Sequence, residues 1–489
     1  MENEGNIQVL ERQNMLLTEQ NLLQQVVINK QSLRIEELEK RITHLENIQS
    51  KNSSNSSKPP SSDGFKRTTS MRKPSGKKPG GQKGHPGRNL PMVAVATKHQ
   101  IHFVTQCSCC GHDISESAVV SYQRRQVTDV PPITIEVTEH MAEQKECPHC
   151  KTVSTAVFPA RVSQPMQYGD NIRQWIVYML NFLMVPVGRT AKFLQDFLGI
   201  HMSEGTVINI QKECAGNLAE FEQKIKAALC KEPVVHFDET GYYIDKLRQW
   251  LHVASTKELT LYMPHPKRGK EAMDAMGILP GFEGVAVHDF WGSYMDYPCG
   301  HELCNVHHLR DLTFCAEQEK NIWAEHMSEL LLKVKSQVEA AKAQKLQSLE
   351  SAQVTEFEQQ YDALVETGKK GHPLPERQKG KRGKVKKSKT RNMIERFDQH
   401  RKSILGFMND FQIPFDNNLA EQDIRMTKTK LKVSGCFRSM EGAENFALIR
   451  SYISTMRKQG INLFDALLSA ITGEPVIPQS LNYAFVLSG

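Results

Sequence analysis

Apolar residues recur every three to four positions between residues 7 and 49, which predicts one long amphipathic helix. In one heptad register, isoleucines occupy position a (Ile28, Ile35, Ile42). The other assigned positions are Asn14 and Asn21 at a, leucines at d (Leu10, Leu17, Leu38, Leu45) and weak d residues Gln24 and Gln31. Isoleucine at a with leucine at d favours two parallel strands, and asparagine at a fixes the register. We therefore expect a coiled coil that joins copies of the chain, although a helix packed on the same chain would show a similar pattern.

Short apolar runs that lead to acidic residues begin near residue 233. Residues 234–237 precede Asp238 and Glu239, and residues 284–288 precede Asp289. Such runs are typical of buried strands that deliver a carboxylate to an exposed end. The first strand is expected to end at Asp238. Further strands are predicted at 241–244, 250–255 and 259–264, with a short helix at 271–276.

Helical spacing dominates the rest of the chain. An apolar stripe that starts at Ile172 predicts helices over residues 169–230. Gly199 would end one helix and Ser203 would cap the next, which is compatible with a helix-turn-helix and equally with any helical hairpin. After Pro414, the pair Asn417–Asn418 is expected to cap a helix that carries Glu421.

Length and composition bound the class of protein. A chain of 489 residues suggests about three or four domains. No apolar run is long enough to span a bilayer, and the N-terminus lacks the apolar core of a signal peptide. We therefore expect a cytoplasmic protein.

The net charge of +7 is unevenly spread. Between Lys51 and Lys98 the chain is rich in serine, proline, glycine and basic residues, and Asp63 is its one acid. This composition predicts a disordered cationic arm that contacts nucleic-acid phosphates, or else a solubilising linker. A second basic run covers residues 377–391. The predicted DNA-contacting residues are Lys77, Lys78, Lys83, Arg88, Arg425, Lys428, Lys430 and Arg438.

Two C-x-x-C pairs stand out among eleven cysteines. Cys107 with Cys110, and Cys147 with Cys150, have the spacing of one tetrahedral structural zinc site. Cys109 and His149 are alternative ligands that spacing alone does not exclude. Extended, β-branched stretches at 119–120 and 133–137 lie between the pairs, which suggests a small zinc ribbon.

Cys304 and His307 have C-x-x-H spacing, and Cys299 or His301 could complete a metal site with them. We favour a structural pair close to the carboxylates. Two strand-end aspartates and one helical glutamate, namely Asp238, Asp289 and Glu421, suit a site for two divalent metals.

The chain resembles bacterial transposases of the insertion sequence 66 family nearly from end to end. The similar parts include the zipper, the linker with Gly-Gly-Gln-Lys-Gly-His at 80–85 and the cysteine module. The most specific blocks are Asp238-Glu239-Thr240, residues 289–294 (Asp-Phe-Trp-Gly-Ser-Tyr), 304–307 (Cys-Asn-Val-His) and 416–421 (Asp-Asn-Asn-Leu-Ala-Glu). Residues 434–439 and 450–460 are similar to the family's C-terminal signature. Gln422 is a departure, because an arginine commonly follows the glutamate.

The resemblance implies that Asp238, Asp289 and Glu421 are the acidic triad of a ribonuclease-H-like DDE transposase. Two Mg²⁺ (or Mn²⁺) ions would support cleavage at the element's terminal inverted repeats and strand transfer into target DNA. It also implies a bacterial, nucleoid-associated protein, for which the coiled coil predicts a homo-oligomer. The sequence leaves open whether accessory proteins of the same element are required. The alternatives are a nuclease of the same fold that does not join DNA, and a DNA-binding regulator derived from an inactive transposase.

The expected fold class is multidomain α+β. Its parts are a coiled coil (1–50), a disordered basic linker (51–98), a zinc-binding module (99–160), a helical, helix-turn-helix-like DNA-binding segment (165–230), a ribonuclease-H-like catalytic domain (231–460) with a helical insertion at about 312–412, and a C-terminal tail (461–489).

Overall fold

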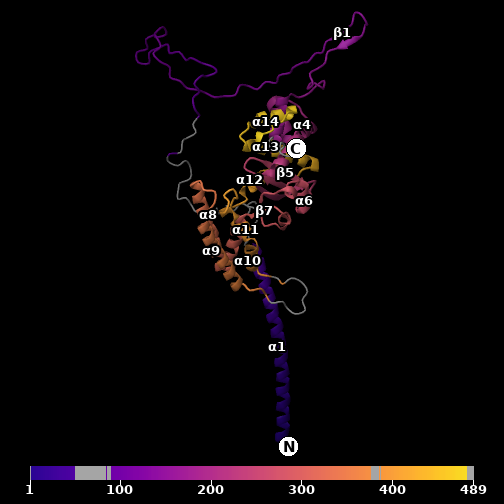
Figure 1. Ribbon diagram of the computed structural model, residues 1–489, viewed down its shortest axis with the longest axis vertical. Helices are drawn as coiled ribbons and strands as arrows, with labels where there is room; N and C mark the ends of the chain where they lie inside the picture. The colour runs from indigo at the N-terminus through magenta and orange to yellow at the C-terminus, as the bar shows by residue number, and fades with distance from the viewer. Residues whose placement is uncertain (1, 50–83, 85–89, 376–384, 386, 482–489) are drawn as a thin grey trace. The chain divides into compact units, whose positions relative to one another are not determined.

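The computed structural model describes residues 2–49, 84, 90–375, 385 and 387–481 (Figure 1). The chain divides into two compact units. The larger unit contains the N-terminal helix with residues 168–191 and 202–489, and the smaller contains residues 71–167 and 192–201. Lys77, Lys78, Lys83 and Arg88 lie outside the described residues, as does most of the second basic run.

Helix α1 (Glu2–Gln49) runs without a break through the region predicted to be helical. The side chains described along it are exposed, including Ile28 (52%), Ile35 (56%) and Ile42 (54%). The apolar stripe is therefore left uncovered within one chain. None of the helices in the described part of the chain is long and apolar enough to cross a membrane.

A five-stranded mixed sheet lies in the larger unit, in the order β5-β4-β3-β6-β7. Its strands are β3 (Val234–Ile244), β4 (Leu247–Ser255), β5 (Thr260–His265), β6 (Val285–His288) and β7 (Gly300–Leu303). The first three form an antiparallel meander, and β6 and β7 run parallel to β3. Helix α6 (Lys270–Met276) follows the meander, as the sequence predicts.

The predicted end of the first strand is wrong. β3 continues six residues beyond Asp238, because Glu239–Ile244 keep pairing with β4 after the pairing with β6 has ended at His236. Asp238 therefore lies inside a long strand. Asp238 has β4 on one side only, because the parallel pairing of β3 with β6 has already ended on the other side.

Helices pack on the three antiparallel strands of the sheet. Helix α12 (Asn418–Ser434) packs against β3 and β4, while α13 (Met440–Lys458) and α5 (Ala219–Lys231) pack against β5. Tyr242 of β3 and Ala420 of α12 are fully buried in the shared core.

A second core is built by the helices between β7 and α12. They are α7 (Asn305–Glu319), α8 (Ile322–Ala343), α9 (Ser351–Gly371), α10 (Lys389–Gln399) and α11 (Arg401–Leu405). Trp323, Tyr361 and Phe397 lie at its centre, and the Tyr361 hydroxyl donates to the Phe397 carbonyl at 2.8 Å. The helical structure that was expected at about 312–412 thus begins at Asn305.

Two helices before the sheet pack with the end of the chain. They are α2 (Asp170–Asn181) and α4 (Glu204–Gly216), which contact α14 (Leu463–Thr472). Helix α3 (Val187–Leu198) lies between them in the sequence. The predicted cap at Ser203 is confirmed, since its side chain accepts from the Thr206 amide at 3.0 Å. Asn217 donates to the carbonyl of Ala470 at 2.8 Å. Residues expected to form a tail therefore contribute a packed helix.

The smaller unit holds two similar cysteine turns. The amide of Cys107 donates to His112 and that of Cys147 to Thr152, both at 2.9 Å. Short antiparallel strands β1 (Gln144–Glu146) and β2 (Val153–Thr155) flank the second turn. The stretches at 119–120 and 133–137 form neither helix nor strand, and the ladder pairing lies beside the second cysteine turn.

Asp423 ties α12 to the sheet and to α13. One carboxylate oxygen accepts from Ser255 (2.6 Å), Thr260 (3.2 Å) and the Lys458 ammonium (2.7 Å). The side chains of Asp423 and Lys458 are only 16% and 14% exposed. Removing one charge of such a pair leaves the other buried and uncompensated.

We predict that Asp423→Ala lowers the free energy of unfolding by about 3 kcal/mol, the cost of leaving a buried charge unpaired. Urea unfolding of the full chain, followed by circular dichroism, measures this change. Glu441→Gln is the matched control, because Glu441 pairs with Lys212 where both side chains are 60% exposed, and exposed pairs contribute little. Equal unfolding midpoints for the two variants would contradict the anchoring role of Asp423.

Candidate active site

Strand register places three chemically active residues in a row. His236 of β3 pairs with Val287 of β6, so Asp238 and Asp289 each lie two residues further at the same level. His288 of β6 pairs with Leu303 of β7, so Asp289 and Cys304 each follow by one residue. Neighbouring strands are about 4.8 Å apart, and residues at one level face the same side. The carboxyl ends of the parallel strands thus gather these residues at one edge of the sheet.

Glu421 reaches this edge from α12, which Asn417 holds in place. The fully buried Asn417 side chain donates to the carbonyl of Phe237 at 2.7 Å and meets His236 Nδ1 at 2.9 Å. Its backbone amide donates to Cys304 Sγ at 3.3 Å. Asn417 therefore links the first turn of α12 to β3 and to the end of β7.

The predicted capping by the asparagine pair is wrong in its mechanism. Asn417 makes no side-chain cap, and the Asp416 carboxylate accepts from the Asn418 amide at 3.1 Å instead. Because the side-chain amide of Asn417 is hydrogen-bonded to β3, the carboxylate of Asp416 accepts from the first turn of the helix instead. Glu421 then lies one turn into the helix, where its amide donates to the Asn417 carbonyl at 3.2 Å.

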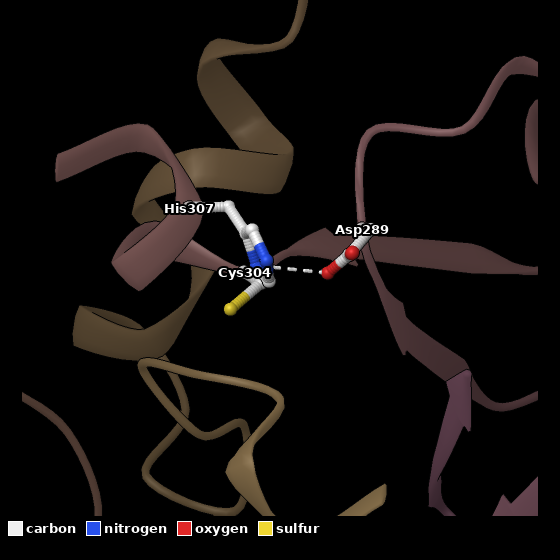
Figure 2. A group of neighbouring side chains, drawn as sticks. All are labelled: Asp289, Cys304 and His307. Atoms are coloured by element: carbon white, nitrogen blue, oxygen red, sulfur yellow. Dashed lines mark ion pairs between the residues drawn. The ribbon is translucent and has the colours of Figure 1, made fainter. Parts of the chain in front are cut away.

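His307 lies between two of the carboxylates. Its Nδ1 is 2.9 Å from Asp289 Oδ1 and 3.9 Å from Glu421 Oε1. Figure 2 shows the imidazole directed at Asp289, with Cys304 beside it. All three of these nitrogen and oxygen atoms are buried and make no well-directed hydrogen bond. His307 thus lies beside Asp289 and Glu421, with Cys304 next to it, whereas His301 contacts His288.

The carboxylates repel one another. Burial raises the pKa of Asp238 well above its usual value, and the charges of Asp289, Glu239 and Glu421 raise it further. A divalent cation would remove this penalty, because it stabilises the ionised form of every carboxylate around it.

Glu239 is next to Asp238 in sequence but is fully engaged elsewhere. Arg268 pairs with one carboxylate oxygen at 2.9 Å, and the Tyr294 hydroxyl donates to the other at 2.6 Å. The guanidinium of Arg268 lies 3.8 Å from the ring centroid of Trp291. These contacts fix β3 beside Asp238 and hold the segment after Asp289.

The sequence did not predict that Asn417 would attach α12 to β3. It also did not predict the buried polar contacts of Arg268, Tyr294 and Asp423. Each works through a partner far away in the chain, so no local spacing reveals it. The acidic pair at 238–239 was a usable signal, since two adjacent carboxylates on a strand face opposite sides and need different partners.

The donor atoms fit divalent metal ions. Asp289 Oδ1 and Glu421 Oε1 are buried without hydrogen-bond partners, and hard cations prefer carboxylate oxygens. Among the described residues, Asp238, Asp289 and Glu421 are not a group with all ligand atoms within 4.8 Å. Two ions about 3.5–4 Å apart do not require that closeness, because the carboxylates can flank the pair.

The zinc candidates form two separate pairs. Hydrogen bonds from Cys110 and Cys109 lower the pKa of Cys107. Contacts from Thr152 and then Cys147 lower the pKa of Cys150 to about 7. No three of Cys107, Cys110, Cys147 and Cys150, all of which are described, have sulfur atoms within 4.8 Å of one another. The low pKa values suit thiolate ligands, and a bound ion would have to draw the two turns together.

The basic candidates on and after α12 differ in accessibility. Arg425 is 57% exposed and pairs with Glu421 at 2.8 Å, and Arg438 is exposed. Lys428 is half-buried. Lys430 is only 8% exposed, its ammonium lies 5.7 Å from the Phe446 ring centroid, and burial lowers its pKa to about 8. The structure therefore does not present Lys430 to solvent.

We predict that His307 is an imidazolium at neutral pH in the metal-free protein. Burial opposes its charge, but contacts with Asp289 and Cys304 outweigh burial and raise the pKa of His307 to about 11. Since this pKa lies above the ordinary value of 6.5, the stabilisation is complete below pH 6.5 and is lost as the pH rises through about 11.

Nuclear magnetic resonance of labelled histidine measures this protonation, with His307→Gln to assign the signal. The His307 signal should not titrate between pH 6 and 9, and in Asp289→Asn its pKa should fall. A midpoint near 6.5 in the unmodified protein would contradict the ion pair.

Three family models match parts of the chain. The family model for the transposase IS66 family matches residues 165–445, more than half of the chain. The zinc-finger binding domain of transposase IS66 matches residues 105–151, and a family of unknown function matches residues 11–91. No curated protein matches the chain. The matched segment contains the central sheet, Asp238, Asp289 and Glu421, and the chain belongs to the IS66 transposase family.

Proposed function

We propose that this transposase cuts DNA at the ends of an insertion sequence and joins the freed ends to target DNA, with Asp238, Asp289 and Glu421 as its catalytic acids. The observation that carries the proposal is the convergence of these residues. Strand register aligns Asp238 with Asp289, and α12 brings Glu421 within 3.9 Å of the histidine that contacts Asp289. The strand order and the parallel pair after an antiparallel meander support a ribonuclease-H-like catalytic domain.

The triad would hold two Mg²⁺ or Mn²⁺ ions, which supply Lewis-acid stabilisation of the attacking and leaving oxygens in phosphoryl transfer. Asp238 and Asp289 contribute oxygens from adjacent strands, and Glu421 contributes from α12. Asn417 keeps the helix and the strand in register. The Arg268–Glu239–Tyr294 contacts orient the backbone on either side of the two aspartates.

DNA contacts would come from basic residues around this edge. Arg425 and Arg438 are exposed, and Lys428 is close enough for the charge of Asp238 to influence its pKa. Release of Arg425 from Glu421 would free a guanidinium for a phosphate and a carboxylate for a cation. The basic arm before residue 90 adds salt-dependent affinity that does not depend on sequence.

The remaining modules would organise the DNA and the protein copies. One Zn²⁺ ion held by Cys107, Cys110, Cys147 and Cys150 would close the module at 105–151. The uncovered isoleucine stripe of α1 supports a parallel coiled coil between two copies. Helices α3 and α4 are the candidates for reading the element's ends.

The proposal predicts metal-dependent nicking and joining of labelled DNA that carries the element's ends. Asp289→Asn, Asp238→Asn and Glu421→Gln should each lower the rate by about 10³-fold, comparable with the loss of one group that stabilises a charged transition state. Gln422→Ala is the matched control, because its side chain is exposed on the same helix turn, and it should act at the normal rate.

The products separate this function from its alternatives. Nicks without joined strands would indicate a nuclease, and specific binding of the ends without cleavage would indicate a regulator. Cleavage that survives all three substitutions would contradict the triad.

A further inference from the structure

We propose that Asp289, Cys304 and His307 form a binding site for one thiophilic divalent cation such as Zn²⁺, distinct from the zinc module. Among the described residues, these three are the only histidine, cysteine or acidic side chains whose ligand atoms all lie within 4.8 Å of one another (Figure 2). They come from three places that the fold brings together: the end of β6, the end of β7 and the first turn of α7.

The distances are close to those of a coordination shell. Ligands of a tetrahedral zinc ion at about 2.0–2.3 Å are separated from one another by roughly 3.3–3.8 Å. The His307 Nδ1 to Asp289 Oδ1 distance is 2.9 Å, and neither atom has a well-directed hydrogen bond. Side-chain shifts of about 1 Å or less would therefore admit an ion, which leaves a fourth position for water or a phosphate oxygen.

The donor set selects the type of cation. A thiolate, an imidazole and a carboxylate suit zinc-like ions, whereas Mg²⁺ prefers oxygen ligands. Cys304 is 1% exposed, and its sulfur already accepts a hydrogen bond from the Asn417 amide at 3.3 Å. An N–H donor of this kind stabilises the thiolate that a cation requires.

Binding has a defined proton balance. The ion takes Cys304 as a thiolate and His307 through the lone pair of Nδ1, so any proton on either atom passes to solvent as the ion binds. The proton that stays on His307 must lie on Nε2, which faces Arg310 Nη1 at 3.3 Å. The guanidinium of Arg310 is itself a donor and cannot accept that proton, so an acceptor in its place would favour the bound ion.

The site has a regulatory consequence, which rests on the proposed function. Asp289 cannot serve this cation and the catalytic Mg²⁺ pair in the same geometry. A thiophilic ion would therefore hold the transposase in an inactive state until it is removed. Binding itself is measured without DNA, so its failure and the failure of the proposed function are separable.

The test is a Co²⁺ titration of the metal-free full-length chain, followed by the absorption bands of cobalt–thiolate coordination. The variants are Cys304→Ser, His307→Gln and Arg310→Gln. Cys315→Ser is the matched control, because Cys315 is a buried cysteine on α7 that lies outside the cluster. The zinc module is unchanged in all of them, so the comparison isolates the second site.

The unmodified protein and Cys315→Ser should bind one more Co²⁺ per chain than Cys304→Ser and His307→Gln. Arg310→Gln, whose amide oxygen can accept from Nε2, should hold that ion about tenfold more tightly. Equal Co²⁺ stoichiometry and equal spectra for the unmodified protein and His307→Gln would overturn the proposal. If Cys304→Ser does not fold, the comparison with His307→Gln alone tests whether the site binds the ion.

Discussion

The parallel pairing of β6 with β3 on one side and with β7 on the other is the constraint on which the site depends. A parallel register of three strands sets Asp238, Asp289 and Cys304 at one level. A shift of one residue would turn each side chain to the opposite face. The positions of Asp238 and Asp289 are therefore fixed by the backbone hydrogen bonds of the sheet. The site is as rigid as the strands that carry it.

The second requirement is to bring Glu421 to the same edge across a long separation in sequence. Helix α12 is attached at two points, through Asn417 at its start and through Asp423 nearly two turns later. Both contacts are buried and polar, so they specify one position of the helix rather than a range of similar ones. The helices between β7 and α12 bury their own core, which lets a large insertion occupy this place without disturbing the sheet.

The helices and strands could be predicted from the sequence more accurately than the contacts that they make with one another. Apolar runs before Asp238 and Asp289 were sufficient to identify strands that carry acids, and the helical stripe of α1 was sufficient to place that helix. The end of β3 was predicted too early, because the acidic residues after it looked like a strand end while β4 kept pairing with them. The tether Asn417 was read as a helix cap, because only the folded chain shows the Phe237 carbonyl beside it.

The central claim is that Asp238, Asp289 and Glu421 jointly form one divalent-metal site. Anomalous diffraction from crystals grown with Mn²⁺ tests it most directly, because manganese is located without reference to activity. We expect two manganese positions about 3.5–4 Å apart, with oxygens of all three carboxylates as ligands. Manganese bound without Asp238 or Glu421, or bound elsewhere in the chain, would contradict it.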